Sequence, residues 1–229
     1  MDTYKITENI KYLLLDMDGT LVDTEPIGPA TFLEQLAAYG VEPEDTDYEL
    51  FIRVWRRDGT DLNEKEFLSS IVDKYSITIP VQEYIKDFFE LYERNITKAD
   101  ALPGVDAFLE KVAMNSKFTL AIVTASKRSQ VQAVLENHNW SSYFDAIVAE
   151  EDIRNHKPDP EPFIVGMNKL GADSSETVVF EDSKNGTRAG KAANCTVIGL
   201  RAGSAPEQDL SAADAVIESF TDIELPQDA

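Results

Sequence analysis

The sequence contains a single cysteine, Cys195, among its 229 residues. One cysteine cannot form an internal disulfide, and such low cysteine usage is typical of proteins in a reducing compartment. Long apolar runs are also missing, since none approaches the roughly eighteen residues that a transmembrane helix needs. Residues 1–11 show no basic cluster followed by an apolar stretch, so we expect no signal peptide. These absences predict a cytoplasmic protein that does not enter a membrane.

Basic residues are scarce relative to acidic ones. The chain has 21 Lys and Arg against 42 Asp and Glu, for a formal net charge of −21. A surface this negative repels nucleic acid and anionic membranes, so we expect neither as a partner. Solubility or adaptation to a saline environment would each account for the excess. If the protein binds a phosphorylated molecule, a metal or a basic side chain must offset the charge at that site.

Short apolar segments alternate with helical patterns over most of the chain. The apolar segments have the length of buried strands and lie at residues 12–15, 118–123, 146–149, 177–180 and 196–200. The helical patterns lie at residues 105–114, 129–137, 160–170 and 183–193. This alternation predicts an α/β fold, a Rossmann-like three-layer α/β/α core with a central parallel sheet. Residues 215–217 predict a further edge strand.

Residues 28–98 interrupt this alternation because they contain no convincing buried strand. Apolar residues there recur at three- and four-residue spacing, which is typical of amphipathic helices. The predicted helices cover residues 30–39, 47–57, 64–75 and 81–95. We therefore predict a small all-helical domain at 28–98, inserted into a core made of 1–27 and 99–229. A chain of this length can bury one sizeable core and a smaller second one.

Polar residues follow directly on the predicted strands. In parallel α/β sheets, ligands bind at the carboxyl ends of the strands, so these residues are expected to share one site. They are Asp16 and Asp18 after the first strand, Thr124 and Ala125 (with Ser126 close behind) after the second, Lys157 in a later loop, and Glu181 and Asp182 after the fourth. As separate features, Asp-Gly is a common turn pair, and Thr or acidic residues often cap helices. Their joint position at strand ends favours a site.

This set of side chains suits phosphoryl chemistry. Several carboxylates in one cleft cannot all stay ionised unless a cation offsets their repulsion. Mg²⁺ prefers a few carboxylates together with waters and a substrate phosphate. A carboxylate facing a phosphoryl group can act as nucleophile, while a lysine and hydroxyl donors stabilise the charge of the group in transfer. We therefore expect Mg²⁺ as cofactor and a small phosphorylated molecule as substrate.

The segment Asp16-Met17-Asp18-Gly19-Thr20 resembles the first motif, D-x-D-G-T, of the haloacid dehalogenase superfamily. Thr124, Lys157-Pro158 and Glu181-Asp182-Ser183 are similar to its second, third and fourth motifs, in the same order. The likeness spans about residues 13–199. The helical insert, entered through Asp23-Thr24-Glu25-Pro26, resembles the cap of the β-phosphoglucomutase-like branch of that superfamily.

The resemblance implies a role for each of these residues. Asp16 would be the nucleophile and a metal ligand, and Asp18 the general acid and base, with its backbone carbonyl also on the metal. Thr124 and the Ala125 amide would hold phosphoryl oxygens, and Lys157 would lie between Asp16 and the phosphoryl group. Asp182 would bind the metal directly, with Glu181 beside it or just behind.

The sequence is compatible with several functions. The first prediction is a phosphatase for small phosphomonoesters, with sugar phosphates as the first guess and a monomer as the default state. The alternative is a phosphosugar mutase of the β-phosphoglucomutase type. Mutases carry a cap histidine where an ungapped count places Gly28, and both histidines, His138 and His156, lie elsewhere. A remoter alternative is a catalytically silent binding module. On the insert, Arg53, Arg56 and Arg57 are candidates for substrate contact or for an ordinary solvated helix face.

Overall fold

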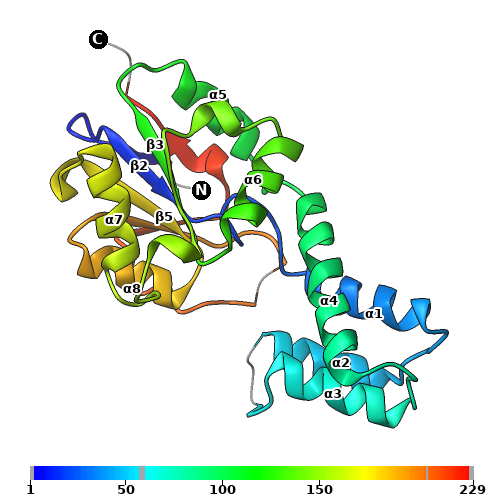
Figure 1. Cartoon of the computed structure of the whole chain (residues 1–229). Coiled ribbons are helices and arrows are strands. Elements are labelled where there is room, and N and C mark those ends of the chain that lie inside the picture. The colour runs from blue at the N-terminus through cyan, green and yellow to red at the C-terminus, as the bar shows by residue number, and fades with distance from the viewer. Residues whose placement is uncertain (1–2, 57–59, 205, 227–229) are drawn as a thin grey trace. The chain divides into compact units, whose positions relative to one another are not determined.

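A computed structural model of the chain describes residues 3–56, 60–204 and 206–226 (Figure 1). The chain divides into two compact units, one of residues 1–23 with 100–229 and one of residues 24–99. The helical unit thus starts four residues before the predicted boundary at 28. Helix α1 (Ile27–Ala38), the first helix of this unit, begins at Ile27 rather than at residue 30. Pro29 lies in its first turn, where the missing N–H removes no helical hydrogen bond.

The first unit is built on a six-stranded, fully parallel sheet. Its strands are β2 (Tyr12–Leu15), β3 (Thr119–Val123), β4 (Ala146–Val148), β5 (Thr177–Glu181), β6 (Thr196–Leu200) and β7 (Ala215–Ile217). They lie in the order β4-β3-β2-β5-β6-β7, so β2 is central and β7 is the edge strand that the sequence predicts. Starting from β2, the chain builds the sheet first toward β4 and then, in the other direction, toward β7.

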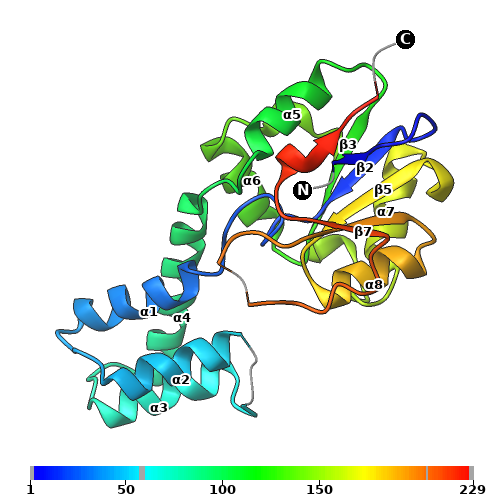
Figure 2. The ribbon, with the colours of Figure 1, turned by 180° about the vertical axis from the view of Figure 1, so that it is seen from behind.

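Helices cover both faces of this sheet. They are α5 (Val105–Ala113), α6 (Arg128–Asn137), α7 (Glu161–Leu170) and α8 (Lys184–Ala192). Figures 1 and 2 show α5 and α6 on one face and α7 and α8 on the other. Right-handed crossover connections require this arrangement. The connections through α5 and α6 lead across the sheet toward β4, whereas those through α7 and α8 lead in the opposite direction, toward β6. The predicted three-layer α/β/α core is confirmed.

Short elements complete the unit. The 3₁₀ helices are η2 (Ser141–Tyr143), η3 (Glu150–Asp152), η4 (Ser174–Glu176) and η5 (Phe220–Asp222). A separate two-stranded sheet pairs β1 (Tyr4–Lys5) with β8 (Ile223–Glu224) in parallel. Sequence reasoning missed this sheet, because two-residue strands are too short to show a hydrophobic period.

The strands are apolar along their whole length because both faces of the sheet are covered. Leu14, Val123 and Val179 pack with Phe163 of α7 and Ala189 of α8 in one buried cluster. The side chains that alternate with these strand residues point to the α5 and α6 face and are also fully buried, among them those at 13, 122 and 180. Among the described residues, no helix combines the length and apolar character that crossing a bilayer requires.

The second unit contains the helices α1, α2 (Asp45–Trp55), α3 (Glu64–Lys74), α4 (Val81–Asn95) and η1 (Ile96–Lys98). Its core is aromatic. Phe51 stacks on Phe32 with ring centroids 4.5 Å apart, and it also meets the rings of Phe67 and Phe88. Such pairs add about 0.5–1.5 kcal/mol each beyond the burial of their area. The helical unit therefore has a hydrophobic core of its own.

The two connections to the helical unit are paired with each other inside the first unit. The Asp23 N–H donates to the Asp100 carbonyl at 2.9 Å, and the Leu102 N–H donates to the Leu21 carbonyl at 2.9 Å. Val22 and Ala101 form an antiparallel bridge between these bonds. The chain thus leaves and re-enters the core through two neighbouring extended segments.

A carboxylate in the helical unit is held by charged hydrogen bonds. Lys74 Nζ donates to both oxygens of Asp47, at 2.7 and 2.9 Å, and also to Glu44 at 2.9 Å, while the Tyr75 hydroxyl donates to Asp47 as well. Burial alone would raise the pKa of Asp47, but the hydrogen bonds from Lys74 and Tyr75 hold it below its usual value. Its stabilising contribution is therefore present above the unfolded-state pKa of about 4 and is lost as the pH falls through the lower folded-state pKa.

We predict that Asp47→Asn lowers the free energy of unfolding of the helical unit by about 1–3 kcal/mol at pH 7, because it weakens hydrogen bonds to a charged group. The difference from the parent should shrink below about pH 4, because Asp47 of the unfolded parent chain becomes protonated there, and it vanishes once the folded-state carboxylate is protonated too. Urea unfolding at pH 7 and pH 3.5 measures both values. Asp45→Asn, an exposed acid in the same first turn of α2, is the matched control and should change stability little. An equal loss at both pH values would contradict the prediction.

Candidate active site

The predicted site residues gather at the carboxyl ends of the central strands. The Asp16 N–H donates to the Phe180 carbonyl at 3.0 Å, and the Thr124 N–H donates to the Val148 carbonyl at 3.0 Å. Each bond continues the sheet by one residue beyond β2 or β3. Asp182 follows β5, the other neighbour of β2. The structure therefore brings the strand-end residues of β2, β3 and β5 to one edge of the sheet.

Lys157 reaches this edge from the loop before α7. Its Nζ donates to Asp16 Oδ1 at 2.5 Å and to the Val123 carbonyl at 3.0 Å, and it also donates to Glu181. Burial would lower the pKa of Lys157, but the charges of Asp16 and Glu181 raise it above its usual value. The ammonium therefore stays charged, and it ties the end of β2 to the end of β5.

Glu181 faces inward and is 1% exposed. While one carboxylate oxygen contacts Lys157, the other accepts hydrogen bonds from the Ser183 N–H at 3.2 Å and the Ser183 hydroxyl at 3.0 Å. The carboxylate lies against Gly186 in α8, where a Cβ would come within 1.8 Å of the Glu181 carboxyl carbon. A larger residue at 186 would displace Glu181, so the glycine fixes the direction of this carboxylate.

Asp182 lies against the turn that follows β2. Gly19 has φ +76°, a conformation that glycine adopts without steric cost, and a Cβ there would lie 2.2 Å from Asp182 Oδ2. The Thr20 hydroxyl donates to Asp182 Oδ1 at 3.3 Å. The Asp-Gly pair in the first motif is therefore more than a generic turn, because its glycine makes room for a carboxylate from β5.

Three carboxylates converge at this point. One oxygen each from Asp16, Glu181 and Asp182 can lie within 4.8 Å of one another. Burial, then the neighbouring charges of Glu181, Asp182 and Asp18, raise the pKa of Asp16 well above its usual value despite the opposing charge of Lys157. Burial and then Glu181 raise the pKa of Asp182 to about 8.

This donor set fits a hard divalent cation. When all three carboxylates are ionised, the single ammonium of Lys157 leaves two negative charges without a partner in the group. Burial, and after it the repulsion between these carboxylates, accounts for the raised pKa values of Asp16 and Asp182. Oxygen donors in this number and charge suit Mg²⁺, which takes one or two carboxylates and completes its shell with waters and phosphate. Of the three, Asp16 and Asp182 are better placed as ligands, because Lys157 and Ser183 already occupy both oxygens of Glu181.

The Asp18 carboxylate lies outside this group and is bound by hydroxyls. Its Oδ2 accepts hydrogen bonds from Thr124 Oγ1 at 3.0 Å and from Ser126 Oγ at 2.6 Å. Thr124 is 1% exposed, whereas Ala125 is exposed at the end of β3. The metal contact that the resemblance implies for Asp18 involves its backbone carbonyl, so the position of the carboxylate leaves that expectation untested.

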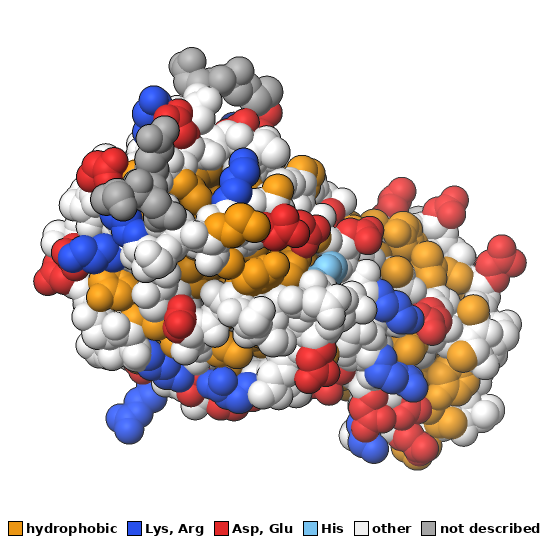
Figure 3. Space-filling model, turned by 90° about the horizontal axis from the view of Figure 1, so that it is seen from above, with side chains coloured by type: hydrophobic (Ala, Val, Ile, Leu, Met, Phe, Trp, Pro, Cys, Tyr) orange, Lys and Arg blue, Asp and Glu red, His pale blue; other side chains and the backbone are white. Residues whose placement is uncertain are grey.

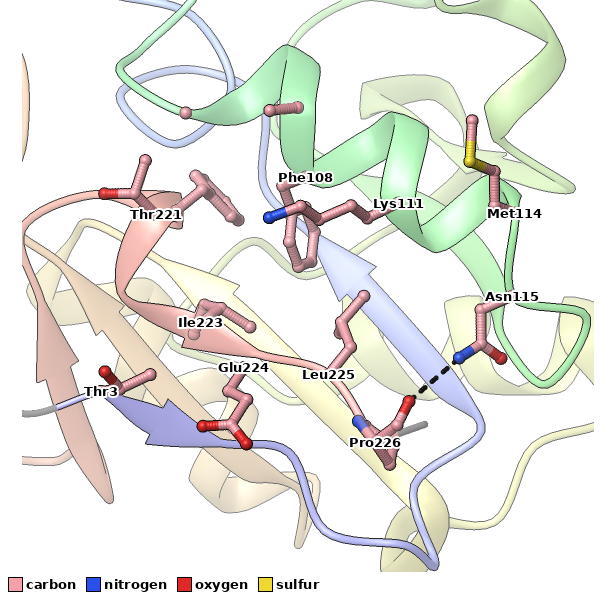
Figure 4. Close-up of a pocket in the computed structure, with 13 residues that line it drawn as sticks. Thr3, Phe108, Lys111, Met114, Asn115, Thr221, Ile223, Glu224, Leu225 and Pro226 are labelled. Carbon is pink, nitrogen blue, oxygen red and sulfur yellow. Dashed lines mark hydrogen bonds between the residues drawn. The ribbon is translucent and has the colours of Figure 1, made fainter. Parts of the chain in front are cut away.

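One other feature of the first unit lies apart from this site. A cavity of about 520 Å³ lies between α5 and the C-terminal strand β8, lined by residues such as Phe108, Lys111 and Ile223 (Figure 4). None of the predicted site residues lines it.

In the helical unit, Arg56 Nε pairs with Glu25 at 2.5 Å, while Arg57 lies outside the described residues. Acidic and basic side chains are interspersed over the face shown in Figure 3.

Comparisons with known proteins agree on the family. The chain matches the model of the haloacid dehalogenase-like hydrolases over residues 13–200. It is 28% identical to a phosphoglycolate phosphatase of Salmonella choleraesuis, over 94% of this chain and 92% of that protein. It is 27% identical to the fructose-1-phosphate phosphatase of Escherichia coli, over 82% of this chain and 95% of that protein. A bifunctional riboflavin kinase/FMN phosphatase of Arabidopsis thaliana is 28% identical over 93% of this chain, which spans 54% of that relative's length.

The fold comparison gives the same result. The structure of a putative β-phosphoglucomutase from Thermotoga maritima superposes with a TM-score of 0.78 at 27% identity, covering 91% of this chain and 94% of that one. The family match runs from Leu13, within β2, to Leu200 at the end of β6, and it includes every strand-end residue of the candidate site. The chain is therefore an enzyme of the haloacid dehalogenase-like hydrolase family.

Proposed function

We propose that this enzyme is a Mg²⁺-dependent phosphatase that hydrolyses small phosphomonoesters through a phosphorylated Asp16. The contact between Lys157 Nζ and Asp16 Oδ1 at 2.5 Å carries the proposal. Through this contact, the ammonium of Lys157 holds one oxygen of the buried Asp16 carboxylate at the end of the central strand. Such a carboxylate is oriented for attack, and the same ammonium offsets charge on the group in transfer.

In this proposal Asp16 attacks phosphorus and the bond to the leaving oxygen breaks. Asp18 supplies a proton to that oxygen and then takes one from the water that hydrolyses the phosphoaspartate. Thr124 and the Ala125 amide hold phosphoryl oxygens. Bound Mg²⁺, held by Asp16, Asp182 and the Asp18 carbonyl, would neutralise charge on the phosphoryl oxygens. Glu181 acts mainly by orienting Lys157.

The substrate class rests on the relatives. Those named above act on phosphoglycolate, on fructose 1-phosphate and on FMN, all small phosphomonoesters. A Thermotoga maritima relative, 29% identical over 79% of this chain, is a phosphatase for phosphorylated carbohydrates. We propose that this enzyme also takes a small phosphorylated metabolite, with sugar phosphates first. Its cytoplasmic location and monomeric state stay predictions from the sequence.

A phosphosugar mutase is the second candidate, since the neighbour from Thermotoga maritima is a putative β-phosphoglucomutase. The residue at position 28 favours hydrolysis. Gly28 lies against the indole of Trp55, where a Cβ would come within 2.1 Å of a ring carbon. No side chain fits at 28 unless Trp55 moves, so the place that the resemblance assigns to the mutase histidine is filled by packing. Incubation with a hexose 1-phosphate should therefore yield free phosphate rather than the isomeric hexose phosphate, as read by ³¹P NMR.

We predict that purified protein with Mg²⁺ releases phosphate from at least one member of a panel of phosphoglycolate, fructose 1-phosphate, FMN and 4-nitrophenyl phosphate. Asp16→Asn should lower kcat by at least a thousandfold, because an amide cannot form the phosphoaspartate. Asp100→Asn, an exposed acid of the same unit, is the matched control and should keep parental activity. A parent that is inactive on the whole panel would sink the phosphatase proposal and favour the silent module.

Metal removal gives a separate prediction. EDTA should abolish phosphate release, and Mg²⁺ at about a hundred times its dissociation constant should stabilise the parent by about 2.7 kcal/mol. Asp182→Asn should lose most of this stabilisation, because it removes one of two proposed carboxylate ligands, whereas Asp100→Asn should keep it. Differential scanning calorimetry with and without Mg²⁺ measures the shift. An unchanged shift in Asp182→Asn would remove Asp182 from the metal site.

A further inference from the structure

The hydroxyl of Ser126 is not accounted for by the roles above. It donates to Asp18 Oδ2 at 2.6 Å, the shorter of the two hydroxyl contacts to that oxygen. Its backbone is fixed on both sides. The Ser126 N–H donates to Thr124 Oγ1 at 3.1 Å, and the Ser126 carbonyl accepts from the Glu150 N–H at 3.0 Å. The hydroxyl therefore has a defined position beside Asp18.

Proton counting separates the parts that Thr124 and Ser126 can play. A hydroxyl has one proton to donate, and Thr124 already accepts from the Ser126 N–H while it donates to Asp18. In the proposed function, the Thr124 hydroxyl donates its proton to a phosphoryl oxygen. It then no longer donates a hydrogen bond to Asp18. Ser126 is then the remaining hydroxyl on Asp18 Oδ2.

The two carboxylate oxygens of Asp18 differ in the hydrogen bonds that they accept. Oδ2 accepts two hydroxyl donors, while no residue in the described part of the chain donates to Oδ1. Ser126 still donates to Oδ2 when Thr124 has turned to the phosphoryl group, so Oδ1 is the oxygen with room for the proton that is transferred. Holding Oδ2 in place fixes the direction of the Oδ1 proton, and a general acid is effective only when that direction meets the leaving oxygen.

We propose that Ser126 is a positioning residue, which holds Asp18 by Oδ2 so that Oδ1 delivers its proton to the leaving oxygen. This inference rests on the proposed function and deepens it. In the step concerned, an Asp16 oxygen forms a bond to phosphorus and the bond between phosphorus and the leaving oxygen breaks. The proton passes from Asp18 Oδ1 to the leaving oxygen, so an alcohol departs and Asp18 becomes a carboxylate.

The test compares leaving groups. An alkyl phosphate needs its leaving oxygen protonated, whereas 4-nitrophenolate leaves without a proton. Ser126→Ala should therefore lower kcat/KM about tenfold for the most active alkyl phosphate of the panel and less than twofold for 4-nitrophenyl phosphate. We choose kcat/KM because it reports the steps through phosphoryl transfer to Asp16, independent of the later hydrolysis. A general loss of structure would lower both values alike.

Further variants sharpen the test. Ser126→Thr keeps a hydroxyl and should recover most of the alkyl phosphate activity. Ser129→Ala, an exposed serine of α6, is the matched control and should leave both substrates unchanged. In an Asp18→Asn background, Ser126→Ala should have no additional effect, because residues that act through one another are not additive. Ser126→Gly replaces Ser126→Ala if the latter does not fold.

The outcomes separate the two proposals. If the parent is active and Asp16→Asn is not, the phosphatase proposal stands. Equal losses on both substrates in Ser126→Ala, no loss on either, or full additivity with Asp18→Asn would then overturn the role of Ser126 alone. If the parent releases phosphate from neither substrate, the proposed function fails, and the role of Ser126 fails with it.

Discussion

The ammonium of Lys157 lies between two buried carboxylates, those of Asp16 and Glu181. Removing one partner of such a buried group typically costs 3–5 kcal/mol, because a charge is left without compensation. The positions of Asp16 and Glu181 depend on this cation. Asp16 can end the central strand as a buried carboxylate only because Lys157 faces it, and Glu181 can point inward only because it shares the same ammonium. Two glycines leave the space that the acids need, Gly186 for the Glu181 carboxylate and Gly19 for that of Asp182.

Much of the core was predictable from the sequence for one physical reason. A sheet covered on both faces needs strands that are apolar throughout, and these stand out as short runs between helical patterns. Strands β2 and β6 and helix α4 lie where the apolar patterns predict them. Because parallel strands end at a common edge, the gathering of Asp16, Thr124 and Asp182 also followed from the pattern, before any distance was known.

Other features depend on three-dimensional contacts that a sequence does not display. The predicted start of α1 at residue 30 is three residues too late, because Gly28 and Pro29 belong to its first turn, where both residues are tolerated. The sheet of β1 and β8 joins two-residue strands from opposite ends of the chain. Within the site, the sequence placed Ser126 near the cleft but gave no sign that its hydroxyl contacts Asp18. That contact joins loops after β2 and β3, and only the folded backbone sets its length.

The antiparallel pairing of Val22 with Ala101 has a consequence for how the chain folds. Strands β2 and β3 are neighbours in the sheet but stand roughly a hundred residues apart in sequence, a separation that slows folding. The helical unit between them has an aromatic core of its own. The pairing of Val22 with Ala101 holds the segments that enter and leave this unit at the spacing of paired strands, about 5 Å. The long loop is then closed, and the pairing of β2 with β3 becomes in effect a local event.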